Sequence, residues 1–278
     1  MRYAIIIIFS FCLLAVACSR GDLSFDERAS KAEAHIGLGN YVAALHEYNA
    51  IAKDFKDDPR HVGILLRIAD LHATNLGNTE AALKKYGEVI DENPLSQAAR
   101  EARERRAVIR EQMNDYEGAI EDYSALLKHF GNDSRNMHYR ILVAGVYLSM
   151  KDYRQAKVEI KPILEDPQVP KDILEQAIFL AAESYFLEGK NKRASGYYRW
   201  LLEEFPESKL ASEAKLHLAT CYEEMGYLGV AGYITESAAK DYPNRGVVDA
   251  RLKSLKERGK GSVDDEAKKD IYKPKELR

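Results

Sequence analysis

The chain has 278 residues, of which 46% are hydrophobic and 31% charged, and its formal net charge is -3. Asp and Glu outnumber Lys and Arg by 44 to 41, so the composition argues against a nucleic-acid-binding protein with a strongly basic face. The apolar content argues against a disordered chain. Two of the three cysteines, Cys12 and Cys18, lie close to the N-terminus, which leaves no basis for a disulfide framework.

The N-terminus begins with an uncharged apolar run at positions 4–17, which follows Arg2. A helix needs roughly 20 apolar residues to span a bilayer, so this run is short for a transmembrane segment. Its length and its small final residues are typical of a secretory signal peptide. The sequence therefore predicts that residues 1–17 are a signal peptide and that the mature chain is exported.

The segment Ala15-Val16-Ala17-Cys18 resembles the lipobox of bacterial lipoproteins, in which a cysteine after small or aliphatic residues is lipidated. The resemblance implies lipid attachment at Cys18, with residues 18–24 as a lipidated tether. Ser19 follows the cysteine where an Asp would retain such a lipoprotein in the inner membrane, which implies the outer membrane. Ala15 stands where Leu is typical, and the same residues fit ordinary signal peptidase, which would release a soluble periplasmic protein.

One sequence unit recurs six times over residues 25–243. Each unit contains a first alanine and a second alanine at a fixed distance, and only the second unit has one residue more between them. The first alanines are Ala32, Ala69, Ala107, Ala144, Ala182 and Ala219. The second alanines are Ala44, Ala82, Ala119, Ala156, Ala194 and Ala231. Four positions after the second alanine stand Tyr48, Tyr86, Tyr123, Ile160, Tyr198 and, in the sixth unit, Thr235.

The second alanines recur with a nearly constant period, and such a period is typical of a stacked array. Two helices approach closely only where side chains are small, so each pair of alanines predicts a helix crossing. The pattern resembles the tetratricopeptide repeat, which implies an all-α, right-handed α-solenoid of about six helix pairs. We expect about 13 helices, the last a capping helix at residues 244–258, and a disordered tail at 259–278.

No catalytic or metal-binding motif stands out. No two of the seven histidines are three or four positions apart, and no nucleophile elbow or phosphate-binding glycine loop is present. The sequence therefore predicts a protein that is not an enzyme and has no metal, no cofactor, no nucleic-acid partner and no small-molecule substrate.

Two surfaces are candidates for protein binding. By their offset from the alanines, five apolar residues tend toward a groove lined by the first helices, or pack between neighbouring first helices. These residues are Ile141, Leu148, Phe179, Phe186 and Leu216. The predicted helix 97–112 carries Arg103, Arg106 and Arg110, which form either a solvated face neutralised by nearby glutamates or a docking surface for an acidic partner.

The signal peptide, Cys18, the tether and the array together resemble BamD-type outer-membrane assembly lipoproteins, and the segment 204–214 is of the kind seen in that family. The resemblance implies a scaffold on the periplasmic face of the outer membrane. The partners of this scaffold would be other envelope proteins, such as a β-barrel assembly complex. The lipid anchor would attach the scaffold to the membrane. Alternatives are a periplasmic coordinator of the Tol–Pal type, a pilus-assembly lipoprotein, or an accessory protein that binds peptidoglycan or a small ligand.

Overall fold

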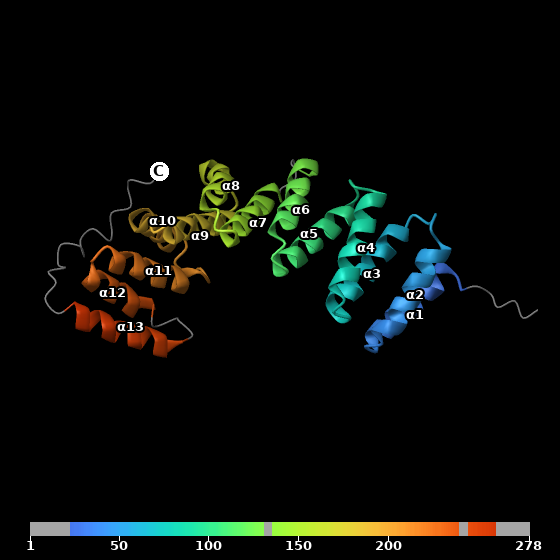
Figure 1. Cartoon of the computed structure of the whole chain (residues 1–278), viewed down its shortest axis with the longest axis horizontal. Coiled ribbons are helices and arrows are strands. Elements are labelled where there is room, and N and C mark those ends of the chain that lie inside the picture. Colours follow the sequence, from blue (N-terminus) through green and yellow to red (C-terminus); the bar gives the residue numbers. More distant parts are fainter. Residues whose placement is uncertain (1–22, 131–134, 239–243, 260–278) are drawn as a thin grey trace, which may run out of the picture. The chain divides into compact units, whose positions relative to one another are not determined.

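The protein is described by a computed structural model that covers residues 23–130, 135–238 and 244–259 (Figure 1). In these ranges it is all-α, with thirteen α-helices, one π-helical turn and no strand, which confirms the predicted fold class. The predicted signal peptide, Cys18 and the tail from residue 260 onward lie outside the described residues. The helices of repeats one to three are α1 (Phe25–Gly37), α2 (Tyr41–Asp54), α3 (His61–Asp70), α4 (Thr79–Glu92), α5 (Gln97–Gln112) and α6 (Tyr116–His129). The helices that follow are α7 (Asn136–Ser149), α8 (Tyr153–Glu165), α9 (Lys171–Leu187), α10 (Asn191–Glu204), α11 (Ala211–Glu224), α12 (Leu228–Ala238) and α13 (Arg245–Arg258).

The chain divides into two compact units, one up to Glu88 and the other from Val89. In the second unit each repeat is a helix pair, α5 with α6, α7 with α8, α9 with α10, and α11 with α12. The second helix of each pair also packs against the first helix of the next repeat, and α7 and α9 are in direct contact. This succession of pairs is the packing expected of stacked helical repeats.

The twelve repeat alanines are buried, as the sequence predicts for helix crossings. All of them have 0% of their surface exposed. The six residues that follow the second alanines by four positions are at most 1% exposed. The close approach of two backbones at each crossing therefore depends on a side chain no larger than a methyl group, with a larger side chain filling the space one turn away.

The turns inside the repeats end each first helix with a residue in the left-handed region. Four of these residues are glycines and one is Asn114, with φ of 60°. The turn of repeat four differs, because Lys151 adopts a φ of 61°. A residue with a Cβ pays roughly 1–2 kcal/mol in this conformation, so Lys151 is strained where the glycine turns are relaxed.

We expect Lys151→Gly to raise the free energy of unfolding by about 0.5–1 kcal/mol. Glycine removes the Cβ clash, and this gain exceeds the cost of the entropy that glycine adds to the unfolded chain. Lys190→Gly is the matched control, because Lys190 lies in the equivalent turn of repeat five with an ordinary φ of -85°. Urea unfolding midpoints measure both changes. A Lys151→Gly midpoint at or below that of the wild type would contradict the prediction.

The extra residue of repeat two is taken up inside its first helix. After α3 the chain forms a π-helical turn, η1 (Leu71–Asn75). The backbone N–H of Leu76 donates to the carbonyl oxygen of Leu71, five positions earlier, at 3.0 Å. A π turn accommodates one additional residue in a continuous helix. Ala69 and Ala82 are therefore both fully buried, although this repeat has one residue more between its alanines than the others.

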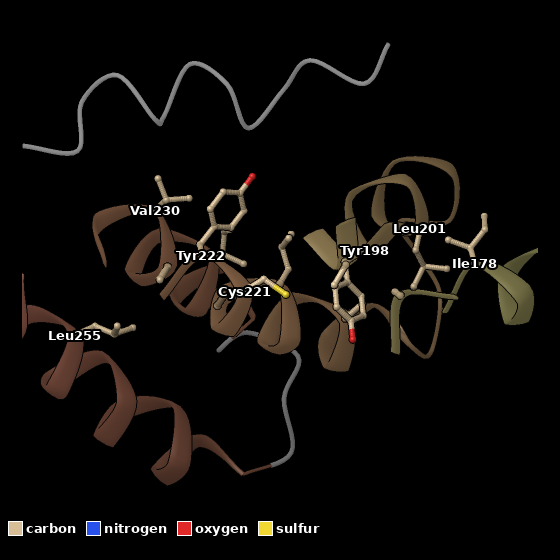
Figure 2. Close-up of a cluster of buried hydrophobic side chains, with 14 residues drawn as sticks. Ile178, Tyr198, Leu201, Cys221, Tyr222, Val230 and Leu255 are labelled. Atoms are coloured by element: carbon tan, nitrogen blue, oxygen red, sulfur yellow. The ribbon is translucent and has the colours of Figure 1, made fainter. Parts of the chain in front are cut away.

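The C-terminal end of the array is covered by α13. Figure 2 shows the core beneath it, where Tyr198 and Leu201 of α10, Cys221 and Tyr222 of α11, and Leu255 of α13 belong to one buried cluster. Asn244 caps the helix by accepting a hydrogen bond from the N–H of Val247. Exposed polar residues fill much of the remaining surface of α13. A helix with one apolar side and one polar side is what closes a repeat array.

Candidate functional site

The first helices carry a stripe of residues that we call the first-helix stripe, defined by the positions three before, one after and four after each first alanine. These positions are spaced i, i+4 and i+7, so they share one helix face. In the second unit the stripe consists of Glu104, Val108 and Glu111 on α5, Ile141, Gly145 and Leu148 on α7, Phe179, Glu183 and Phe186 on α9, and Leu216, Thr220 and Glu223 on α11. All five apolar residues predicted to line a groove belong to it.

The structure places these five residues at different depths. Ile141 is only 5% exposed and packs in a cluster with Ile160 and Ile173, so little of it is accessible to a partner. Phe179 and Phe186 are partly buried, and each meets the ring of Tyr198 edge-on with 6.3 Å between centroids. Leu148 and Leu216 are also partly buried. Much of this apolar surface therefore packs between helices, and its role in partner binding stays a prediction.

A tyrosine–carboxylate pair recurs at the stripe. The residue one after the first alanine is Glu33, Asp70 or Glu183 in repeats one, two and five. Each accepts a hydrogen bond from the hydroxyl of the buried tyrosine of the second helix, namely Tyr48 at 2.6 Å, Tyr86 at 2.8 Å, and Tyr198. Burial together with the neighbouring carboxylate raises the pKa of Tyr48 and of Tyr198. A buried phenol requires such a partner, so the pair is one structural unit.

In repeats four and six both members of this pair are replaced, whereas repeat three keeps Tyr123 but has Val108 in place of the carboxylate, and Tyr123 donates to Glu111 instead. Repeat four has Ile160 in place of the tyrosine and Gly145 in place of the carboxylate. Repeat six likewise has Thr235 and Thr220. The joint replacement leaves neither a hydroxyl nor a carboxylate buried without its partner. Our reading of the sequence missed this coupling, although alignment of the six units on their alanines displays it.

Gly145 has no evident role in the packing of α7. It lies inside the helix, where glycine costs about 0.5–1 kcal/mol relative to alanine. A Cβ at this position would have no heavy atom within 4 Å, so crowding does not explain the glycine. Its φ is not positive either. The backbone of α7 is thus accessible at the point where other repeats carry the carboxylate.

His217 links repeats five and six across the stripe. Its Nδ1 lies 2.6 Å from Glu183 Oε1, the same oxygen that accepts from the Tyr198 hydroxyl. The imidazole stacks on Phe186 with 4.9 Å between centroids.

Burial, together with the charge of Glu183, raises the pKa of the nearby Cys221 thiol to about 12. The thiol is therefore protonated at neutral pH, which makes it a poor nucleophile.

Arg103, Arg106 and Arg110 of α5 are buried or largely buried and are bound within the chain, which corrects the reading of a solvated face neutralised by nearby glutamates. Arg106 forms a bidentate contact with Asp122 of α6, with Nε 2.9 Å from Oδ2 and Nη2 2.6 Å from Oδ1. Arg110 Nη1 donates to the same carboxylate at 3.0 Å. Arg103 is 6% exposed and donates to the carbonyl oxygen of Pro94 at 2.7 Å. Burial lowers the pKa of Arg103.

The partner of these arginines could have been found from the repeat. Asp122 lies three positions after its second alanine, as do Glu47 and Glu159 in repeats one and four. Glu47 pairs with Lys31 at 2.6 Å and Glu159 pairs with Arg140 at 2.7 Å, in each case a cation from the first helix. The hydrogen bond from Lys31 lowers the pKa of Glu47. The charge of α5 is thus matched within the chain, and its role in docking stays a prediction.

In residues 23–130, 135–238 and 244–259, no group of three or more His, Cys, Asp or Glu side chains is arranged to hold a metal ion. Over the same residues, no helix has the length and apolar character needed to cross a bilayer.

Comparison with known proteins agrees with the repeat architecture. Tetratricopeptide-repeat family profiles match residues 30–94, 71–136 and 176–208, which together span about half of the chain. A search of curated proteins found no significant match. Among solved structures, a tetratricopeptide repeat protein from Parabacteroides merdae is 17% identical, with a TM-score of 0.61 over 88% of this chain and 96% of that one.

Two further structures share the fold. A signal-transduction ATPase with numerous domains from Pyrococcus horikoshii, which has a tetratricopeptide repeat sensor, is 16% identical with a TM-score of 0.62. The match covers 88% of this chain and 41% of that protein. The protein MamA is 16% identical with a TM-score of 0.50, over 65% of this chain and 91% of MamA. At these identities the likeness concerns the fold alone.

Proposed function

The chain belongs to the tetratricopeptide-repeat family, and on that premise we propose that it is a non-enzymatic scaffold which holds other proteins of the bacterial envelope. The observation that carries the proposal is the contrast between constant packing positions and a varied first-helix stripe. The twelve alanines are the same in every repeat, whereas the stripe changes from acidic on α5 to largely apolar on α7 and α9. Stacked helical repeats use such a varied surface to recognise proteins.

We further propose that the scaffold is anchored by lipid at Cys18 to the periplasmic face of the outer membrane. Support for this location comes from the N-terminal sequence, with its apolar run, its lipobox-like segment and Ser19 after the cysteine. A lipidated cysteine with several acyl chains gains roughly 0.8 kcal/mol for each buried CH2 group, which suffices for stable anchoring. The partners would then be envelope proteins such as a β-barrel assembly complex.

We expect a palmitate analogue to label the wild-type chain in cells and not to label Cys18→Ser. Cys221→Ser is the matched control and should keep the label, because Cys221 is buried in α11. In-gel detection of the analogue, with the chain located by antibody, measures the labelling. A label that persists in Cys18→Ser, or an unlabelled soluble species that begins at Cys18 in the wild type, would refute the anchor.

The scaffold function is tested by cross-linking in intact cells, followed by purification of the chain and mass spectrometry of the products. The proposal predicts specific envelope proteins, with a β-barrel assembly protein among them. If the chain instead returns no protein partner and sediments with purified peptidoglycan, the glycan-binding alternative replaces the proposal.

A further inference from the structure

Two successive repeats of the second unit lack the carboxylate that repeats one, two and five carry one position after the first alanine. One position after the first alanine, repeats three and four have Val108 and Gly145. Val108 is 46% exposed, although it is a large apolar side chain. On the first helix of the next repeat, the backbone of α7 is open at Gly145, where a Cβ would meet nothing within 4 Å. A mid-helix glycine with no packing role is typical of a place where another chain approaches the backbone closely.

Val108 and Gly145 lie between two carboxylates, each of which is oriented by a hydrogen bond from a buried tyrosine. On α5, Glu111 accepts a hydrogen bond from the hydroxyl of Tyr123 at 2.6 Å. On α9, Glu183 accepts from Tyr198 and also lies 2.6 Å from Nδ1 of His217. A carboxylate has about four acceptor positions, so these bonds orient the group and leave capacity for a further donor. Side chains that are already ordered lose less entropy when a partner binds.

The neighbouring charges make this part of the surface acidic. Glu111 lies on α5, and Glu213 and Glu224 are exposed on α11, whereas Glu104 of α5 is paired with Arg135 at 3.4 Å. The positive charges nearby are engaged, since Arg106 and Arg110 pair with Asp122, and Arg251 pairs with Glu223 at 3.0 Å. A partner that complements this surface has apolar or small residues in its centre and cations toward its ends.

We propose that the stripe from α5 to α9 binds a cationic amphipathic segment of a protein partner, with a small residue seated against Gly145 and Lys or Arg side chains reaching Glu111 and Glu183. This inference rests on the proposed scaffold function and specifies the class of segment that the scaffold accepts. The apolar side of the segment covers Val108 and Leu148, which lie on adjacent first helices linked by the hydrogen bond from Tyr139 to Glu104 at 2.5 Å.

The test uses the full mature chain and a labelled peptide of about 15 residues, four helical turns, with alanine at its centre, leucines beside it and lysines toward both ends. Fluorescence anisotropy measures its dissociation constant at several salt concentrations. We expect binding that weakens as salt rises, and much weaker binding of the same peptide with glutamates in place of the lysines.

Gly145→Leu should weaken binding at least about tenfold, because the new side chain occupies the space against α7. The same substitution should raise the melting temperature, since leucine favours the helix. Gly232→Leu is the matched control, because Gly232 lies inside α12 and also has open space in front of it. It should raise the melting temperature and leave the affinity unchanged. Glu111→Gln keeps an acceptor for Tyr123 but loses the charge, and should weaken binding severalfold and reduce its salt dependence.

If Gly145→Leu binds the peptide as tightly as the wild type does, the contact between the partner's small residue and Gly145 of α7 is overturned. Equal or tighter binding of the glutamate peptide overturns the cationic class, and so does a failure of the lysine peptide to bind. None of these results decides the scaffold function, which depends on the cross-linked envelope partners. If cross-linking returns no envelope protein but the lysine peptide binds tightly and depends on Gly145, the envelope scaffold function fails while the peptide-binding surface stands.

Discussion

Asp122→Ala should lower the free energy of unfolding by roughly 3 kcal/mol, because it leaves the largely buried guanidinium group of Arg106 without its counter-charge and removes the nearest carboxylate from Arg110. Asp122 is 1% exposed and binds Arg106 and Arg110 together. Breaking a buried ion pair from one side costs far more than the pair itself contributes, since the remaining cation loses its hydration without compensation. Urea unfolding followed by circular dichroism measures the change.

Glu121→Ala is the matched control for this prediction. Its side chain is 77% exposed and lies 3.6 Å from Arg110 Nη1, so its removal should change stability by less than about 0.5 kcal/mol. The glutamate and the aspartate are adjacent in the sequence but differ in burial. Equal effects of the two substitutions would show that the arginines of α5 are solvated after all.

Ala194→Leu should destabilise the second unit by about 1–3 kcal/mol. Ala194 has no exposed surface and lies on α10, which packs against α9, so the larger side chain must push the helices apart. The stability of a repeat array is close to a sum over repeats and interfaces, so the loss should be local. The thermal melt, followed by the helical circular dichroism signal, should therefore broaden or separate into two transitions.

The control for Ala194→Leu is Ala250→Leu, at an exposed position of α13. The substitution is chemically the same, but the new side chain points into solvent, so the melting curve should stay close to that of the wild type. If both variants melt like the wild type, Ala194 does not mark a tight crossing, and the packing scheme of the repeat is wrong.

The fold follows from the sequence because its requirements are local and repeat six times. A crossing tolerates only a small side chain, so Ala107 and Ala119 fix one helix pair without knowledge of any other. The same logic placed the first helix of repeat three at residues 97–112, and the structure has α5 over Gln97–Gln112. Steric requirements of this kind are visible in a single sequence.

The charged contacts did not follow, because they depend on which face of one helix meets another. Arg103, Arg106 and Arg110 of α5 have glutamates nearby on the same helix, which suggested local ion pairs on a solvated face. The carboxylate that binds Arg106 is instead on α6, the second helix of the repeat. Likewise, the coupling of Gly145 with Ile160 joins positions on two helices, and periodicity along one helix does not reveal it.

The π turn in repeat two has a consequence for how such a chain gains and loses single residues. Insertions in globular proteins are usually confined to loops, because a residue added to a helix rotates everything after it by about 100°. At Leu71–Asn75 the added residue is confined to one widened turn, and the next helix still buries Ala82 completely. A helix of this array can therefore absorb a one-residue change in length while the neighbouring repeats keep their register. Differences in repeat length between related arrays need not be sought in their loops alone.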